Sequence, residues 1–235
     1  MDPRGHRGVK GFFVAGTDTG VGKTEVACAL GAALLRRGLK PIPFKPVETG
    51  CDPAAPPDAL ALREACAADL SLDRVCPYRF RMPAAPLVAA EREGREIDLS
   101  LIEGIARQAG DDPLLLEAAG GLLVPLAPPL FTNLDLIERL GLPVVLVARA
   151  GLGTLNHAAL SFAALERRKL PVVAIVLNRT AAEDDPTVES NPRWVAALTG
   201  ARVLGPTPFV RDRRSRLDTL AQMLDPLVDT PPPRR

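Results

Sequence analysis

The sequence has almost no net charge. Its 235 residues carry 29 basic and 28 acidic side chains, for a formal charge of +1. Proteins that hold nucleic acid mainly by electrostatics need a concentrated basic surface, so this balance argues against a nucleic-acid partner. Apolar residues make up 47% and charged residues 24%, as in an ordinary globular protein, which argues against a disordered chain. At this length we predict a single domain over residues 1–235, with flexible ends at 1–10 and 229–235.

Long apolar runs and paired cysteines are also missing. The most apolar region, residues 114–130, is interrupted by Glu117, two glycines and several prolines, so we predict no membrane span and no membrane partner. Only five residues follow the basic start before Gly16 interrupts the apolar stretch, which is too short for a secretory signal. The four cysteines show no C-x-x-C spacing and are expected to be free thiols in a reducing compartment. These absences predict a cytoplasmic protein.

Lysine is the scarce cation. Five of the 29 basic residues are lysine and the other 24 are arginine. A GC-rich coding bias explains this skew without any functional meaning. Two of the five, Lys23 and Lys45, nevertheless stand beside motifs that follow short apolar runs. A compact ammonium and a planar guanidinium are not interchangeable at a phosphate site, so lysine is expected to be needed at these two positions.

Short apolar runs alternate with helical stretches along the chain. Runs that are apolar on both faces are typical of parallel strands covered by helices, and they occupy residues 12–15, 41–44, 114–117, 144–147 and 172–177. Helices are predicted at 23–37, 58–67, 99–108, 134–140, 154–168 and 217–227. Loops are predicted at 52–57, 81–86 and 180–192. The alternation predicts a doubly wound α/β fold, a mostly parallel sheet with helices on both faces, and ligands at the carboxyl ends of the strands.

A glycine-rich segment, GTDTGVGKT at residues 16–24, follows the first predicted strand and opens the first helix. This is the context of a P-loop, whose backbone N–H groups and helix N-terminus bind phosphate oxygens. Lys23 would add a positive charge, and the Thr24 hydroxyl is placed to ligate Mg²⁺. The strict pattern has a glycine where Thr17 stands, so the loop is a variant, and a turn that merely caps a helix is the alternative. The motif makes the predicted fold P-loop NTPase-like.

Three further charged residues stand where a phosphate site would need them. Lys45 precedes Pro46, which favours extended backbone, so it is predicted at the end of the second strand beside the P-loop; an exposed loop lysine is the alternative. Glu117 ends the third predicted strand, where a P-loop enzyme holds Mg²⁺, and a capping carboxylate is the alternative. Asp58 begins a helix, so metal binding and helix capping explain it equally well.

Taken together, these segments resemble the dethiobiotin synthetase family, ATP-dependent enzymes that close the ureido ring in biotin synthesis. The matching segments run in order from residue 12 to about residue 210. They are GTDTGVGKT at 16–24, KPVETG at 45–50, DALAL at 58–62, EAAGGLLVP at 117–125, GLGTLNH at 151–157 and Asn178. The P-loop alone indicates nucleotide binding, whereas its combination with Lys-Pro-Val and Glu-x-Ala-Gly-Gly is specific.

The resemblance implies a homodimer that acts on ATP, CO2 and 7,8-diaminononanoate with Mg²⁺. One substrate amine would form a carbamate, ATP would phosphorylate it to a carbamic–phosphoric anhydride, and the second amine would close the ring. The products would be dethiobiotin, ADP and phosphate. Such a reaction needs charge neutralisation on phosphate and carbamate oxygens more than a protein nucleophile.

The resemblance also implies a role for each matching residue. Lys23 and Lys45 would be catalytic, and Thr24, Asp58 and Glu117 would gather round the metal. ATP would contact Thr19, Gly20, Val21, Gly22, Lys23, Thr24, Glu25, Asp58, Glu117, Ala118, Ala119, Gly120, Asn178, Pro208, Phe209 and Val210, of which Asn178 and 208–210 face the adenine. The diamine would contact Thr17, Lys45, Thr49, Gly153, Thr154, Leu155 and Asn156, of which 153–156 bind the substrate carboxylate across the dimer interface.

Two positions depart from the family pattern, and other functions remain as alternatives. Gly20 stands where some members have glutamate, and Ala118 replaces the usual glycine. A P-loop ATPase switch of the partitioning type would be expected to carry a basic amphipathic helix or patch. A small-molecule kinase would release a stable phosphorylated product. An ATP-dependent amidotransferase would need an added cysteine–histidine domain, for which there is no room.

Overall fold

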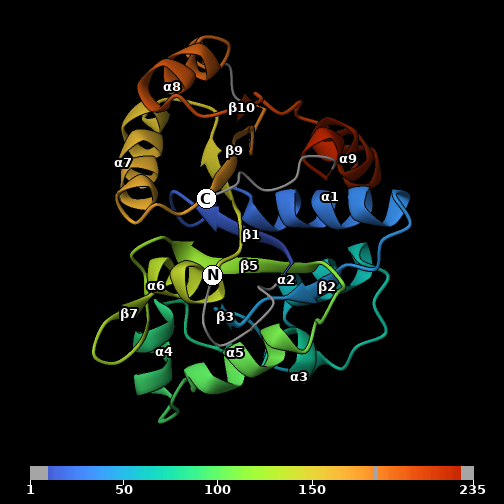
Figure 1. Ribbon diagram of the computed structural model, residues 1–235, viewed down its shortest axis with the longest axis vertical. Coiled ribbons are helices and arrows are strands. Elements are labelled where there is room, and N and C mark those ends of the chain that lie inside the picture. Colours follow the sequence, from blue (N-terminus) through green and yellow to red (C-terminus); the bar gives the residue numbers. More distant parts are fainter. Residues whose placement is uncertain (1–9, 183–184, 229–235) are drawn as a thin grey trace.

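A computed structural model describes residues 10–182 and 185–228 of the chain (Figure 1). The predicted flexible ends, 1–10 and 229–235, lie outside these ranges except for Lys10, whose Nζ is 2.8 Å from Asp111 Oδ1. The division of the chain into domains stays a prediction. Within the described ranges, no helix combines the length and the apolar character that a membrane crossing requires.

Six strands of the described ranges form the main sheet, and each is parallel to its neighbours. Their order across the sheet is β10-β9-β8-β1-β5-β2. The strands are β1 Gly11–Gly16, β2 Ile42–Phe44, β5 Leu114–Gly121, β8 Val144–Arg149, β9 Val172–Asn178 and β10 Val203–Leu204. Each predicted apolar run overlaps one of β1, β2, β5, β8 and β9, with Pro41 alone outside its strand, so the predicted parallel α/β sheet is confirmed.

Helices cover both faces of this sheet. They are α1 Lys23–Arg36, α2 Pro57–Ala65, α3 Leu72–Val75, α4 Pro86–Arg92, α5 Leu99–Arg107, α6 Asn133–Leu140, α7 Thr154–Arg167, α8 Asn191–Thr199 and α9 Arg213–Val228. Two small sheets complete the described part: β3 Val47–Thr49 pairs in parallel with β4 Tyr78–Phe80, and β6 Pro125–Ala127 pairs antiparallel with β7 Phe131–Thr132.

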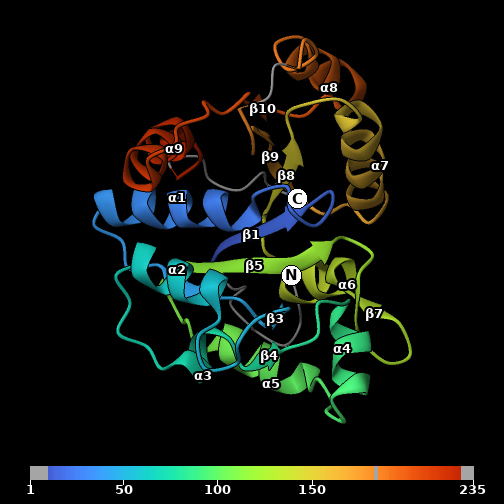
Figure 2. The same cartoon turned by 180° about the vertical axis from the view of Figure 1, so that it is seen from behind.

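The sheet separates two apolar cores. On one face, Val14 and Val145 pack with α1, α2 and α9. On the other, Phe13 and Leu146 pack with α4, α5, α6, α7 and α8. Both views of the ribbon show α9 lying beside α1, and Arg36 on α1 pairs with Asp218 on α9 at 2.6 Å (Figures 1 and 2). Successive strand residues thus alternate between the two cores, which is why the strands are apolar on both faces.

Several boundaries differ from the sequence prediction. β5 was expected to end at Glu117 but continues to Gly121, because the small residues that follow let the strand pair again with Gly16 of β1. α8 begins at Asn191, inside the predicted loop 180–192, of which residues 183 and 184 lie outside the described ranges. The Asn191 amide fixes that end by donating to Ala150 O at 2.7 Å. α9 begins four residues before the predicted 217.

The four cysteines are buried free thiols, as predicted, in the part of the chain that the structure describes. Burial raises the pKa of Cys66 to about 12 and also raises the pKa of Cys28 and Cys76. A buried thiol of raised pKa is a poor nucleophile. These side chains therefore fill the cores and are not reactive groups.

Candidate active site

A cavity of about 740 Å³ opens at the carboxyl edge of the main sheet. Its walls come from segments that are far apart in the sequence: the P-loop, the β2–β3 segment, the start of α2, residues 83–86 and the end of β5. Most of the predicted site residues line it, namely Thr19, Gly20, Gly22, Lys23, Thr24, Glu25, Lys45, Thr49, Asp58, Glu117, Ala118, Ala119 and Gly120. The fold therefore brings the P-loop and both predicted carboxylates to one site, as the strand order requires.

The P-loop owes its shape to glycine at two places. Gly22 is the N-cap of α1 with a φ of +86°, and a Cβ there would lie 1.9 Å from Asn178 Nδ2. A Cβ at Gly16 would lie 2.8 Å from Lys23 Cδ. A side chain at either position would fill the space that the loop and its lysine occupy. The loop thus presents the N-terminus of α1, where free N–H groups and the helix dipole favour an anion.

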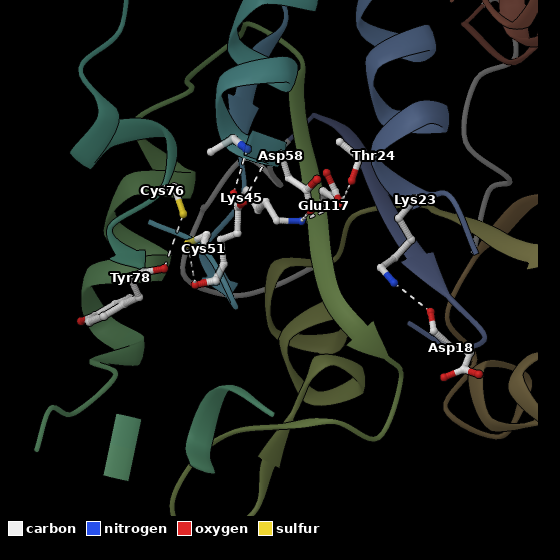
Figure 3. Close-up of polar contacts among 11 residues, drawn as sticks. Asp18, Lys23, Thr24, Lys45, Cys51, Asp58, Cys76, Tyr78 and Glu117 are labelled. Atoms are coloured by element: carbon white, nitrogen blue, oxygen red, sulfur yellow. Dashed lines mark hydrogen bonds and ion pairs between the residues drawn. The ribbon is translucent and has the colours of Figure 1, made fainter. Parts of the chain in front are cut away.

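Lys23 is buried at the base of this loop. Its side chain is 7% exposed, and its Nζ donates to the backbone oxygen of Asp18 at 2.8 Å (Figure 3). Burial lowers the pKa of Lys23 to about 8, although the charge of Glu117 opposes the shift. Because its near neighbour is a neutral carbonyl, the ammonium has little compensation for lost hydration, and an incoming phosphate would supply it.

Lys45 joins two carboxylates on the opposite wall (Figure 3). Its Nζ lies 2.6 Å from Glu117 Oε1 and 2.9 Å from Asp58 Oδ2. Burial alone would lower the pKa of Lys45, but these two carboxylates together raise it above its ordinary value. Lys45 is 4% exposed, so the interpretation as an exposed lysine is wrong. Glu117 is 1% exposed and lies inside β5, so the interpretation as a loop-capping carboxylate is wrong too. The N-cap of α2 is Pro56, so Asp58 does not serve as a helix cap either.

Glu117 Oε1 accepts from both Lys45 and the Thr24 hydroxyl, the latter at 2.8 Å. Among the described residues, the other carboxylate oxygen, Oε2, is buried without a hydrogen-bond partner. A buried carboxylate oxygen with no donor is suited to a cation, and hydroxyl and carboxylate oxygens are the ligands that Mg²⁺ prefers. Thr24, Glu117 and the partly exposed Asp58 therefore fit a magnesium ion.

Asn178 and residues 208–210, which are expected at the adenine, lie outside the lining of the cavity that the described residues form. The Asn178 amide donates to Val21 O at 3.1 Å and to Glu25 Oε2 at 3.0 Å, and it accepts from the Thr207 hydroxyl at 2.8 Å. This amide is thus already engaged in protein contacts. Of the segment 208–210, Pro208 is exposed, while Phe209 and Val210 are half-buried.

The segment 153–156 is also absent from the cavity lining within the described chain. Gly153 caps α7, and Thr154 is buried with a hydroxyl that has no partner among the described residues. Thr17 lies at the start of the P-loop, where its hydroxyl is likewise buried and unpartnered in the described ranges. One chain therefore brings Thr49 and Lys45 to the cavity but not the residues expected to hold the far end of the substrate.

The two departures from the family pattern are accommodated differently. Gly20 has a φ of +74°, and no described heavy atom lies within 4 Å of where its Cβ would be. Ala118 is buried within β5, where it belongs to the same core as Phe13 and also lines the cavity.

Sequence reasoning missed Glu48, a 4% exposed carboxylate in β3 that lines the cavity. Its oxygens accept from the backbone N–H groups of Asp58 and Ala59 at the start of α2. A signal was present: Pro56 and Pro57 have no N–H and no polar side chain, so a helix beginning there needs an acceptor from elsewhere in the chain.

The chain is similar to known proteins over most of its length. Residues 10–215 match a family model described as an AAA domain. The ATP-dependent dethiobiotin synthetase BioD of Anaeromyxobacter sp. (strain K) is 49% identical, over 92% of this chain and 97% of that protein. The proteins of the same name from Thermodesulfovibrio yellowstonii and Aeromonas hydrophila are 37% and 39% identical, over 86% and 89% of this chain and 90% and 97% of their own lengths.

A solved structure, the signal recognition particle receptor FtsY of Elizabethkingia anophelis, is 17% identical with a TM-score of 0.48, covering 92% of this chain and 67% of that one. That likeness is too distant to bear on function. The sequence relatives match nearly end to end at identities well above those of chance similarity, which confirms the resemblance predicted from the motifs. The chain belongs to the ATP-dependent dethiobiotin synthetase family.

Proposed function

We propose that this protein converts 7,8-diaminononanoate, CO2 and ATP to dethiobiotin, ADP and phosphate. The observation that carries the proposal is the buried Lys45–Glu117 pair, which faces a P-loop lysine across one cavity. A reaction through a mixed anhydride needs positively charged protein groups beside both the transferred phosphoryl group and the carbamate, because both are anionic. Two lysines on opposite walls of the cavity supply that charge at two places.

The P-loop wall binds the nucleotide. Lys23 and the N-terminus of α1 neutralise the phosphate oxygens, and the Thr19–Glu25 segment wraps them with backbone N–H groups. The remaining contacts expected for ATP are those of residues 117–120 at the end of β5 and, at the adenine, those of Asn178 and residues 208–210. Since the Asn178 amide is engaged with Val21 and Glu25, it supports the loop that holds the phosphates in addition to any contact with the base.

Lys45 acts on the carbamate. One substrate amine attacks CO2 and loses a proton to form a carbamate, whose oxygen attacks the γ-phosphorus as ADP leaves. The second amine then attacks the carbamoyl carbon, and phosphate leaves as the ring closes. Lys45 stabilises the anionic oxygens in each step, while Asp58 and Glu117 keep it protonated. The substrate supplies both nucleophiles, so the protein has to orient and neutralise them and exclude water.

Mg²⁺ is proposed to be held by Thr24, Asp58 and Glu117. When bound, it would withdraw charge from the phosphate oxygens during transfer. In the ranges that the structure describes, no three His, Cys, Asp or Glu side chains form a complete metal site. This suits an ion that shares its ligands between a few protein oxygens and the nucleotide phosphates.

A homodimer is proposed to complete the substrate site. Residues 153–156 lie outside the cavity of their own chain and would bind the substrate carboxylate in that of the partner. Exposed leucines stand near this segment and on the loops that flank β6, with exposed fractions of 77% for Leu152, 64% for Leu160, 68% for Leu123 and 70% for Leu130. Light scattering tests the dimer, and mixing Asn156→Ala with Lys45→Arg protein tests the shared site, because a mixed dimer would regain one intact cavity.

The cytoplasm is the proposed location, supported by four buried free thiols in the described chain, which are typical of reducing compartments.

The assay that tests the function measures ATP turnover with and without each co-substrate. We expect turnover to require the diamine and bicarbonate together, and dethiobiotin to appear one for one with phosphate. ATP hydrolysis that ignores the diamine but responds to lipid or DNA would overturn the proposal in favour of an ATPase switch. Accumulation of a stable phosphorylated diamine would overturn it in favour of a kinase.

A further inference from the structure

We propose that Glu48 is a positioning residue for Lys45: its buried carboxylate clamps the first turn of α2 and thereby fixes Asp58 against the lysine. The inference rests on the proposed function for its effect on catalysis, although the clamp itself can be measured without any turnover. Glu48 belongs to the same KPVETG segment as Lys45, so one short stretch of chain supplies both the lysine and the group that arranges its partner.

The start of α2 depends on a distant acceptor. Pro56 and Pro57 have no N–H group, and the first helical hydrogen bond runs from Leu60 N to Pro56 O at 3.1 Å. The N–H groups of Asp58 and Ala59 lie before that bond in the chain. Glu48 binds both of them, with Oε1 3.0 Å from Asp58 N and Oε2 2.9 Å from Ala59 N. A carboxylate at this end of the helix also interacts favourably with the helix dipole.

Glu48 is itself held firmly. It is 4% exposed and lies at the centre of β3, where its backbone stands opposite that of Arg79 in the parallel pairing with β4. Burial raises the pKa of Glu48, and the two N–H groups from α2 oppose that shift. The clamp therefore consists of a desolvated carboxylate on a short strand, with both of its oxygens committed to the α2 backbone.

This clamp matters because burial does not hold the Asp58 side chain. The Asp58 side chain is 42% exposed, and its contact with Lys45 Nζ is 2.9 Å. Burial fixes the side chains of Lys45 and Glu117. Asp58 belongs to the first turn of α2, so the position of that turn decides whether its carboxylate reaches Lys45. Releasing the first turn of α2 would move Asp58 away, leaving Lys45 with Glu117 as its remaining carboxylate contact.

The test compares Glu48→Ala, Glu48→Gln, Asp58→Ala and the double variant Glu48→Ala/Asp58→Ala. Asp98→Ala is the matched control, because Asp98 makes the same kind of contact at the start of α5, accepting from Ser100 N at 2.8 Å outside the cavity lining. For each protein we would measure kcat for dethiobiotin, the Kd of ADP, the unfolding temperature and hydrogen exchange at the amides of residues 58 and 59.

We expect Glu48→Ala to lower kcat about 10- to 100-fold, as misplacement of a catalytic group does, while the Kd of ADP stays within about twofold. Glu48→Gln keeps one acceptor and should retain more activity. The double variant should be no slower than Asp58→Ala alone, because Glu48 acts through Asp58. Amides 58 and 59 should lose protection in Glu48→Ala but not in Asp98→Ala, which should keep its kcat.

Unchanged protection of amides 58 and 59, multiplicative losses in the double variant, or full activity in Asp58→Ala would each overturn the inference. If neither Glu48 variant folds, the carboxylate serves the fold and not the placement of Asp58, which also overturns it. Wild-type protein that makes no dethiobiotin would contradict the proposed function, while the exchange data would still decide whether the clamp exists.

Discussion

Two buried lysines face the same cavity, and their charges are managed in opposite ways. Lys23 and Lys45 are 7% and 4% exposed, yet the pKa of Lys23 is lowered and that of Lys45 is raised. Burial is nearly equal, so the partners decide: Lys23 contacts a backbone carbonyl, whereas Lys45 contacts two carboxylates. Lys23 therefore depends on a ligand for its negative charge, whereas the protein itself supplies the negative charge beside Lys45.

The largest effect should come from replacing Lys45 with arginine, which keeps the charge but not the shape. A planar guanidinium cannot take the place of an ammonium held 2.6 Å from one carboxylate and 2.9 Å from another in a closed site. We expect Lys45→Arg to lower kcat about 1000-fold, a loss typical of removing a preorganised electrostatic contact. Calorimetry should show ADP binding unchanged, and near-normal turnover would remove Lys45 from the mechanism.

Removing the charge of Lys45 altogether should destabilise the fold. Lys45→Met leaves Glu117 buried without its ammonium, which we expect to lower the free energy of unfolding by about 3 kcal/mol in urea titrations. Lys45→Met/Glu117→Gln should recover part of that loss, because no unpaired buried charge remains. A double variant less stable than Lys45→Met would show that the pair is not the source of the effect.

The P-loop wall should be sensitive to shape. Gly22→Ala places a Cβ against the Asn178 side chain, at a residue whose φ is left-handed. We expect the free energy of unfolding to fall by about 2 kcal/mol, because backbone strain is combined with a broken hydrogen bond. Gly20→Ala is the matched control, since its φ is also positive but the described chain leaves its Cβ in open space. Equal losses of stability in the two variants would mean that Asn178 contributes nothing to the loop.

A smaller predicted effect is a pH dependence of nucleotide binding that arises from Lys23. Its pKa in the free protein is about 8, and a bound phosphate would raise it, so binding takes up a proton and weakens as pH rises. We expect the affinity for ADP to fall about tenfold between pH 7 and pH 9. Calorimetry in buffers of different ionisation enthalpy should detect the proton uptake at pH 8. Lys23→Arg should abolish both this uptake and the pH dependence of ADP affinity.

By the same linkage, Lys23 affects the stability of the unliganded protein. Its folded pKa of about 8 lies below the ordinary value of 10.5, so between these values the unfolded chain binds more protons than the folded one. This contribution to the free energy of unfolding therefore rises with pH over that range. The difference between urea titrations of the wild type and of Lys23→Arg, measured across this pH range, gives the Lys23 contribution. A contribution that fell as pH rose would contradict the lowered pKa of Lys23.

The comparison of the two walls also shows what the sequence could predict. Strands apolar on both faces could be located from pattern alone, and with them the P-loop that follows β1 and the position of Lys45 directly after β2. The pattern could not show that Glu117 lies within a longer strand, because the pairing of Gly121 with Gly16 depends on two distant segments. β3 and β4 have three residues each, too few for a period to be visible.

The roles of Glu48 and Asn178 depend on contacts between segments distant in the chain. Glu48 accepts hydrogen bonds from residues ten and eleven positions later, and Asn178 contacts a loop residue 157 positions earlier. Neither contact follows from local propensity. The missing cap at Pro56 and Pro57 was the one local sign that an acceptor had to come from elsewhere.

The central claim is that the carbamate oxygen, and not water, attacks ATP. It is tested most directly by a brief reaction with the diamine and ATP in ordinary water, supplied with ¹⁸O-labelled CO2, followed by mass spectrometry of the phosphate. If Lys23 and Lys45 assemble a mixed anhydride, the released phosphate carries one labelled oxygen from CO2. Unlabelled phosphate formed alongside dethiobiotin would contradict the account.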